Sequence, residues 1–335
     1  MGFDRVPNAD GGRRATLIGL GFLVSMALPC VARAAVGPVR IALLGGGAPA
    51  DTQEFFHTFT EELARIGFRR GSDVEFETAF ANNSSTQADQ IASDAAARGA
   101  AILVAVGAAI AAAAKLRPAI PLVIVQSGDP VLAGYADSYA RPGRHITGLS
   151  MLAVDLIPKR LEMLREFRPS AKIVAFVASP EHAGQQRELA AAHAGAARLD
   201  LKVQYYEVRT PQQVDAALAS MAVDRPGAAL LFSDALMVGQ RHKLAEFFLQ
   251  RQIPSAAGWR RFPESGHLMS YGPERKALWR RAAHIVAKIV QGANPALIPI
   301  ELPTVVELVI NRTTAGAMQL KIPAGLLARA DEVVD

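Results

Sequence analysis

The chain alternates short apolar runs with stretches of helical periodicity, and it completes this pattern twice. Apolar runs without alternation suit strands buried on both faces of a parallel sheet, whereas apolar residues three and four positions apart form one face of a helix. The clearest run is Leu122 to Val125, which gives way abruptly to the turn-forming residues Ser127-Gly-Asp-Pro130. Strands and helices alternating at this interval predict an α/β fold with doubly wound parallel sheets.

The alternation predicts a set of elements in each half of the chain. The expected strands are 39–44, 74–79, 101–106, the run from 122, 172–178, 201–208, 228–232, 268–271 and 305–310. The expected helices are one from Asp51, then 86–98, an alanine-rich one before Pro118, 154–167, 181–199, 211–222, 237–251 and 273–290. Asp51-Thr-Gln-Glu54 resembles a capping box, and Gly67 is placed to end the helix that it would begin.

A chain of 335 residues is long enough for two α/β lobes of ordinary size. We place the first crossing between them at residues 141–150, RPGRHITGLS, which have two glycines and no helical period. The second lies at Pro273, the expected first residue of a long helix, and the third follows Gly292, where prolines recur. The sequence therefore predicts one lobe from 35–148 plus 273–300 and another from 149–272 plus 301–335.

Residues 1–34 are expected to be a signal peptide. Arg13 and Arg14 precede an apolar run from Ala15 to Leu28, and Ala32-Arg33-Ala34 offers small residues at the spacing that a signal peptidase needs. The run is short for a bilayer span, which favours removal over anchoring. We expect a periplasmic protein exported by the Sec or the twin-arginine route.

Cysteine and motif content argues against several classes of protein. The only cysteine, Cys30, lies in the predicted signal peptide, so the exported chain would have no thiol for a disulfide, a metal or catalysis. The seven histidines lack metal-ligand spacing, and no P-loop or GxSxG elbow occurs. We expect no enzymatic activity, no metal and no cofactor.

Charge argues against a nucleic-acid partner. Loss of residues 1–34 would remove four arginines and two aspartates and lower the formal net charge from +5 to +3. The remaining lysines and arginines are spread along the chain rather than clustered in a basic patch. We expect a monomer that does not bind nucleic acid.

Several stretches resemble a known family. GDPVLAGYADSYARPGRHITGLS, KRLEMLREFRPSAKIVAFV, WRRFPESGHLMSYG and the closing PTVVELVINRTTAGAMQLKIPAGLLARADEVVD are similar to ABC-type solute-binding proteins related to the tryptophan-binding protein of Gram-positive bacteria. The resemblance covers nearly the whole chain after the predicted signal peptide, and the closing segment is its most specific part. The resemblance implies the type I periplasmic-binding fold, in which two Rossmann-like lobes joined by three crossovers close over a small ligand. Characterised relatives bind aromatic amino acids.

A carboxylate held between two such lobes needs hydrogen-bond donors from strand-end loops and helix starts, where backbone N–H groups are unpaired. In the first lobe the candidates are Gly46, Gly47, Gly107, Ala108, Ser127, Asp129, Thr147 and Ser150. The family usually has a Ser or Thr in the loops of Gly46 and Gly107, so this chain would rely on backbone contacts there. Asp129 could instead cap its own turn, and Thr147 and Ser150 could instead absorb hinge bending.

In the second lobe the candidates are Ser179, Asp234, Trp259 and Tyr271. Asp234 corresponds to an acidic position in the family that can meet a ligand ammonium, or it could cap the helix that follows it. Trp259 and Tyr271 could stack on a flat ligand, or pack in the core. Arg260 and Arg261 could pair with a carboxylate, or be surface charges.

The sequence thus predicts an exported solute-binding protein of an ABC importer. It would capture a small carboxylated solute, such as an amino acid or aromatic acid, and hand it to a permease in the inner membrane. An alternative is a periplasmic sensor that presents a small molecule to a membrane receptor.

Overall fold

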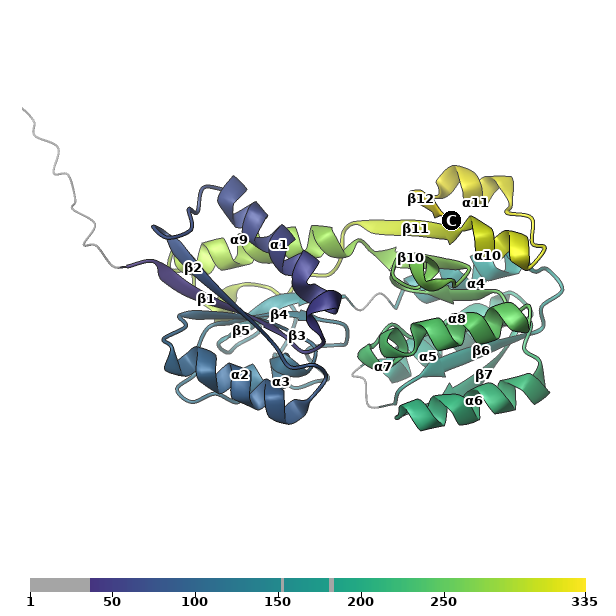
Figure 1. Cartoon of the computed structure of the whole chain (residues 1–335), viewed down its shortest axis with the longest axis horizontal. Coiled ribbons are helices and arrows are strands. Elements are labelled where there is room, and N and C mark those ends of the chain that lie inside the picture. The colour runs from purple at the N-terminus through teal and green to yellow at the C-terminus, as the bar shows by residue number, and fades with distance from the viewer. Residues whose placement is uncertain (1–36, 152–153, 181–183) are drawn as a thin grey trace, which may run out of the picture. The chain divides into compact units, whose positions relative to one another are not determined.

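The structure is a computed structural model that describes residues 37–151, 154–180 and 184–335. The predicted signal peptide and Cys30 lie outside the described residues. Two α/β lobes make up the described part of the chain, each built around its own mainly parallel sheet (Figure 1). The predicted fold class is confirmed.

The first sheet has five parallel strands in the order β2-β1-β3-β4-β5. The strands are β1 (Val39–Gly45), β2 (Val74–Phe80), β3 (Ile102–Val106), β4 (Leu122–Gln126) and β5 (Ile146–Ser150). The helices of this lobe are α1 (Pro49–Arg65), α2 (Ser85–Ala97), α3 (Ala108–Ala114) and α9 (Arg275–Val290). Alternate residues of β1 serve opposite faces: Ile41 packs with α1 and α9, and Ala42 with α2 and α3.

The second sheet has seven strands in the order β12-β11-β10-β9-β8-β6-β7, all parallel except the β10–β11 pair. The strands are β6 (Ile173–Ala178), β7 (Lys202–Glu207), β8 (Ala228–Leu231), β9 (Ser255–Ala257), β10 (Met269–Pro273), β11 (Val306–Asn311) and β12 (Glu332–Val334). The helices are α4 (Leu156–Phe167), α5 (Gln185–Arg198), α6 (Pro211–Asp224), α7 (Ala235–Gly239), α8 (Arg241–Gln250), α10 (Arg312–Ala317) and α11 (Ala324–Arg329).

The chain passes between the lobes after β5, between β10 and α9, and before β11. The prediction that all of 141–150 is a crossing is wrong, because residues 146–150 form the buried strand β5. Gly148, at φ 141°, allows close packing of β5 on β4: a Cβ there would lie 2.1 Å from the carbonyl oxygen of Ile124. The predicted lobe boundary between residues 148 and 149 falls inside this strand.

The structure also corrects how three predicted helices begin or divide. Helix α1 begins at Pro49, so Asp51 lies in its first turn and does not cap it. Pro273 ends β10, and the carboxylate of Glu274 caps α9 by accepting hydrogen bonds from the backbone N–H of Lys276 (2.8 Å) and Ala277 (2.7 Å). The predicted helix 237–251 is two helices, α7 and α8, which meet at Gln240.

Candidate functional site

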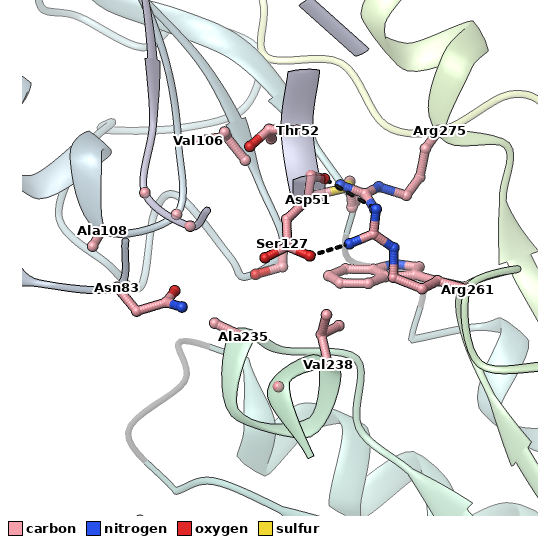
Figure 2. Close-up of a pocket in the computed structure, with 16 residues that line it drawn as sticks. Asp51, Thr52, Asn83, Val106, Ala108, Ser127, Ala235, Val238, Arg261 and Arg275 are labelled. Atoms are coloured by element: carbon pink, nitrogen blue, oxygen red, sulfur yellow. Dashed lines mark hydrogen bonds and ion pairs between the residues drawn. The ribbon is translucent and has the colours of Figure 1, made fainter. Parts of the chain in front are cut away.

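A cavity of about 260 Å³ is lined by both lobes (Figure 2). Gly46, Gly47, Gly107, Ala108 and Ser127 line it from the strand-end loops of the first sheet. Ala235, Val238, Trp259 and Arg261 line it from the second lobe, and Arg275 lines it from the first turn of α9. These loops meet because the carboxyl ends of parallel strands share one edge of a sheet, which is where ligands bind in open α/β folds.

The loops after β1 and β3 are held against each other by backbone contact. The N–H of Gly46 donates to the carbonyl of Val106 at 2.8 Å. A Cβ at Gly46 would lie 2.3 Å from the backbone nitrogen of Ala108, so only glycine allows this approach. Gly107 has φ 64°, a conformation that side chains disfavour, and α3 begins at the next residue. The first loop therefore packs directly on the beginning of α3.

An ion pair joins the lobes at one side of this cavity. Nη1 of Arg261 lies 2.5 Å from Oδ1 of Asp51, and Nη2 donates to the Asp51 carbonyl at 3.3 Å. Because α1 begins before Asp51, this carboxylate is free of capping and can bind the guanidinium. The Arg261 side chain is only 15% exposed, so its charge is held in place beside the cavity.

Arg275 lies between two aromatic rings. Its guanidinium carbon is 4.0 Å from the ring centroid of Phe55 and 4.9 Å from that of Trp259, within the range of cation–π contact. Its Nε is buried without a hydrogen-bond partner among the described residues. Burial, and then the nearby charge of Arg261, lowers the pKa of Arg275 to about 9. Figure 2 shows both guanidinium groups extending toward Asp51.

A second, wider cavity of about 1000 Å³ adjoins the first. The two share Asn83, Gly107, Ala108, Ser127 and Ala235 as lining residues. The wider cavity also reaches Ser179 and Asp234, which follow β6 and β8. The two cavities are therefore parts of one cleft between the strand ends of the two sheets.

Asp234 caps α7 and borders this wider cavity. Its Oδ1 accepts a hydrogen bond from the N–H of Met237 at 2.8 Å, and the residue is 5% exposed. Burial raises the pKa of Asp234 to about 6, although the backbone N–H groups of Met237, Leu236 and Ser179 favour the ionised form. Asp234 thus has the cap role, and it lies at the cleft as well.

Eight of the twelve predicted site residues come together at the cleft: Gly46, Gly47, Gly107, Ala108, Ser127, Ser179, Asp234 and Trp259. Of the two neighbouring arginines, Arg261 lines the narrower cavity, whereas Arg260 pairs with Glu264 at 2.8 Å.

Four predicted site residues line neither cavity: Asp129, Thr147, Ser150 and Tyr271. Oδ1 of Asp129 accepts from the N–H of Val131 at 2.9 Å, and Oδ2 pairs with Arg187 of α5.

Of the other predicted residues that line neither cavity, two form hydrogen bonds with the backbone and one packs in a core. Thr147 donates its hydroxyl to the Ile298 carbonyl at 2.7 Å, and Ser150 donates to the Gly128 carbonyl at 2.9 Å. Tyr271 lies on β10 and packs with the second-lobe core rather than at the cleft. A position at the end of a strand does not by itself show whether a side chain faces the cleft or forms a hydrogen bond with the backbone.

Sequence reasoning missed Asp51, Asn83 and Arg275. Asp51 has the residue pattern of a helix cap, and Arg275 lies in a charged segment, Pro-Glu-Arg-Lys, that is typical of an exposed helix start. Their place at the cavity depends on how the lobes and α9 pack, for which the sequence holds no local signal.

Among the described residues, no three His, Cys, Asp or Glu side chains are grouped so as to hold a metal ion. No helix in that part of the chain has the length and apolar character needed to cross a membrane.

Comparison with known proteins adds relatives of this architecture. A tyrosine-binding protein of Clostridioides difficile (strain R20291) is 23% identical over 265 residues, which cover 78% of this chain and 76% of that one. A conserved domain protein from Vibrio cholerae has a TM-score of 0.79 at 22% identity, covering 88% of this chain and 99% of that one. An ABC domain from Streptococcus pneumoniae in complex with L-Trp has a TM-score of 0.79 at 18% identity, covering 89% and 100%.

The model of the ABC transporter substrate binding protein family matches residues 50–334. The match spans both lobes and every residue that lines the narrower cavity from Asp51 to Arg275. Such proteins bind solutes and are not enzymes. This chain therefore belongs to the ABC transporter substrate-binding protein family.

Proposed function

We propose that the protein captures a small carboxylated solute between its lobes in the periplasm and delivers it to an ABC permease. The observation that carries the proposal is the cavity of about 260 Å³, lined by strand-end loops of one lobe and by Trp259 and Arg261 of the other. Loops at helix starts present unpaired N–H groups, and an arginine presents a planar pair of donors, so the lining suits an anion.

Binding would be coupled to the arrangement of the lobes. A solute that touches both lobes only when they are closed binds that form more tightly and shifts the population toward it, whereas equal affinity would shift nothing. Delivery to a permease requires such a change, because the transporter must distinguish loaded protein from empty protein. The lining from both lobes supplies contacts of this kind.

The relatives favour an aromatic or amino-acid-like solute. One is a tyrosine-binding protein, and another was solved in complex with L-Trp. In this chain Trp259 is 8% exposed and lines the cavity, where its indole offers an apolar surface to a ring. We therefore include aromatic amino acids and aromatic acids among the candidate solutes.

A thermal-shift screen of amino acids and aromatic acids tests the proposal, followed by calorimetry on the compounds that raise the melting temperature. A ligand at 100 times its Kd adds about 2.7 kcal/mol to the free energy of unfolding. The variant Ala235→Trp would fill space at an exposed alanine that lines both cavities, and should abolish the shift.

Ala216→Trp is the matched control, because Ala216 is an exposed alanine of α6 that lines neither cavity. It should keep the full thermal shift. Binding that survives Ala235→Trp unchanged would show that the solute binds elsewhere, and the proposal would be wrong.

A further inference from the structure

We infer that the solute is an organic anion with a carboxylate and no neighbouring ammonium group, and that Arg275 binds this carboxylate. The inference rests on the proposed function and deepens it, because it names the chemical class of the solute and a residue that selects it. It is carried by the charges around the narrower cavity and by the surroundings of Arg275.

Three charged side chains line the narrower cavity: Asp51, Arg261 and Arg275. Asp51 and Arg261 form an ion pair at 2.5 Å and neutralise each other. Beyond them, Glu54 lies between two cations, 3.9 Å from the ammonium of Lys276 and 4.0 Å from Nη2 of Arg261, so this second acidic group is paired as well. One positive charge, that of Arg275, is left without a paired carboxylate in this part of the described structure.

The Arg275 guanidinium lies over the rings of Phe55 and Trp259. The described residues give its buried Nε no hydrogen-bond acceptor. A pKa of about 9 keeps most of the group charged at neutral pH. A cation that is desolvated and unpaired is unfavourable, and a bidentate carboxylate would restore its lost hydrogen bonds.

An ammonium group has no corresponding place in this cavity. The carboxylate of Asp51 already binds Arg261, and Asp234 lines the adjoining cavity rather than this one. The lining of the narrower cavity thus holds no unpaired carboxylate, and the buried Asp234 Oδ2, which has no hydrogen-bond partner among the described residues, lies in the lining of the adjoining cavity. An amino acid whose carboxylate met Arg275 would therefore place its ammonium near two guanidinium groups. Like charges in such a site disfavour binding.

The rest of the lining suits a small apolar body. Val106, Met151, Val238 and Trp259 contribute carbon surface, and the volume of about 260 Å³ is near the lower end of the range of roughly 300–1,000 Å³ for small-molecule sites. A single ring on a short carboxylated chain matches this combination. We take 3-phenylpropionate as the probe.

Calorimetry of four compounds at neutral pH tests the inference on the unaltered protein. The set is 3-phenylpropionate, its amide, L-phenylalanine and phenethylamine, which share a ring and differ in charge. We expect 3-phenylpropionate to bind at least about tenfold more tightly than each of the others, a difference of about 1.4 kcal/mol.

Variants then assign the effect to Arg275. Arg275→Gln should weaken binding of 3-phenylpropionate at least about tenfold while leaving affinity for the amide unchanged, and Arg275→Lys should fall between the two proteins. Arg280→Gln removes an equal charge from an exposed position of the same helix and should leave both affinities unchanged. A merely structural role for Arg275 would instead weaken the acid and the amide alike.

Three results would overturn the inference. These are binding of L-phenylalanine as tight as that of 3-phenylpropionate, equal losses for acid and amide in Arg275→Gln, and no binding of 3-phenylpropionate at all. Each leaves the proposed function open to its own test, because an amino acid that binds the unaltered protein and is blocked by Ala235→Trp would still support solute capture.

Discussion

Gly46 brings the loop after β1 into backbone contact with the beginning of α3. A Cβ there would lie 2.3 Å from the Ala108 nitrogen and 2.8 Å from the Val106 carbonyl oxygen, and neither backbone atom can move aside as a side chain could. Gly46→Ala should therefore lower the free energy of unfolding by about 1–3 kcal/mol, the usual cost of overpacking. Denaturation with urea measures the change.

The matched control is Gly316→Ala in α10, where an added Cβ meets nothing within 4 Å. Alanine in a helix is more favourable than glycine, so this variant should gain about 0.5–1 kcal/mol. If Gly46→Ala were as stable as the unaltered protein, the close approach of the two loops would be wrong.

Among individual residues, the sequence could predict those whose role follows from their place at the end of a strand. Gly46, Gly107 and Ser127 follow apolar runs, and the ends of parallel strands share an edge. Arg275 could not be predicted, because its stacking partners Phe55 and Trp259 lie far from it in the chain and meet it only through tertiary packing.

Thr147 ties β5 to the segment that returns toward the second lobe. Its buried hydroxyl donates to the Ile298 carbonyl at 2.7 Å, and the residue has no exposed surface. Thr147→Val would leave that carbonyl unpaired and should destabilise the protein by about 1–3 kcal/mol, without changing solute affinity. Urea denaturation and calorimetry give the two quantities.

Thr58→Val is the control for this substitution, because Thr58 donates to the Glu54 carbonyl within α1 at an exposed site. Its effect should stay within about 0.5 kcal/mol. A loss of solute affinity in Thr147→Val without loss of stability would place Thr147 at the site after all.

His267 connects β9 with α8 and makes stability depend on pH. Its Nε2–H donates to the Arg241 carbonyl at 2.8 Å, and Nδ1 lies 3.0 Å from the Ser255 hydroxyl, which can donate to it when the ring is neutral. Burial lowers the pKa of His267 to about 4. Below pH 6.5 the unfolded chain binds a proton that the folded chain does not, so this contribution to stability is lost as pH falls from 6.5 through 4.

Urea denaturation at pH 7 and pH 5 tests this contribution. The unaltered protein should lose more of its unfolding free energy between these pH values than His267→Asn does, because the variant has no imidazole to protonate. Since other titrating groups are shared, the difference isolates His267. Equal pH dependence in the two proteins would contradict the assignment.

For whole elements, sequence predicts the long, strongly periodic ones and misses the short ones. β3 is a continuous apolar run, and β1 and β4 each contain four consecutive apolar residues, so all three can be found without tertiary information. β9 is only Ser-Ala-Ala, and β5 interleaves Thr, Gly and Ser with its two apolar residues. Their strand conformation depends on pairing with neighbours rather than on their own composition.

At the scale of the molecule, ion pairs connect the lobes at two places across the cleft. Arg261 pairs with Asp51 and, at 4.0 Å, with Glu54 of α1, and Arg187 of α5 pairs with Asp129 after β4. The Asp129 side chain is 3% exposed and that of Arg187 is 54% exposed, so their pair is partly screened by solvent. The predicted two-lobed fold is confirmed, whereas these contacts between distant residues follow only from how the lobes pack.

Small-angle X-ray scattering tests whether the two lobes close on a solute that is held between them. The radius of gyration should be measured without ligand and at saturation with the compound that gives the largest thermal shift, using Ala235→Trp as the protein that cannot bind it. We predict a smaller radius of gyration for the saturated protein and no change for the variant. An unchanged radius of gyration at verified saturation would contradict the account.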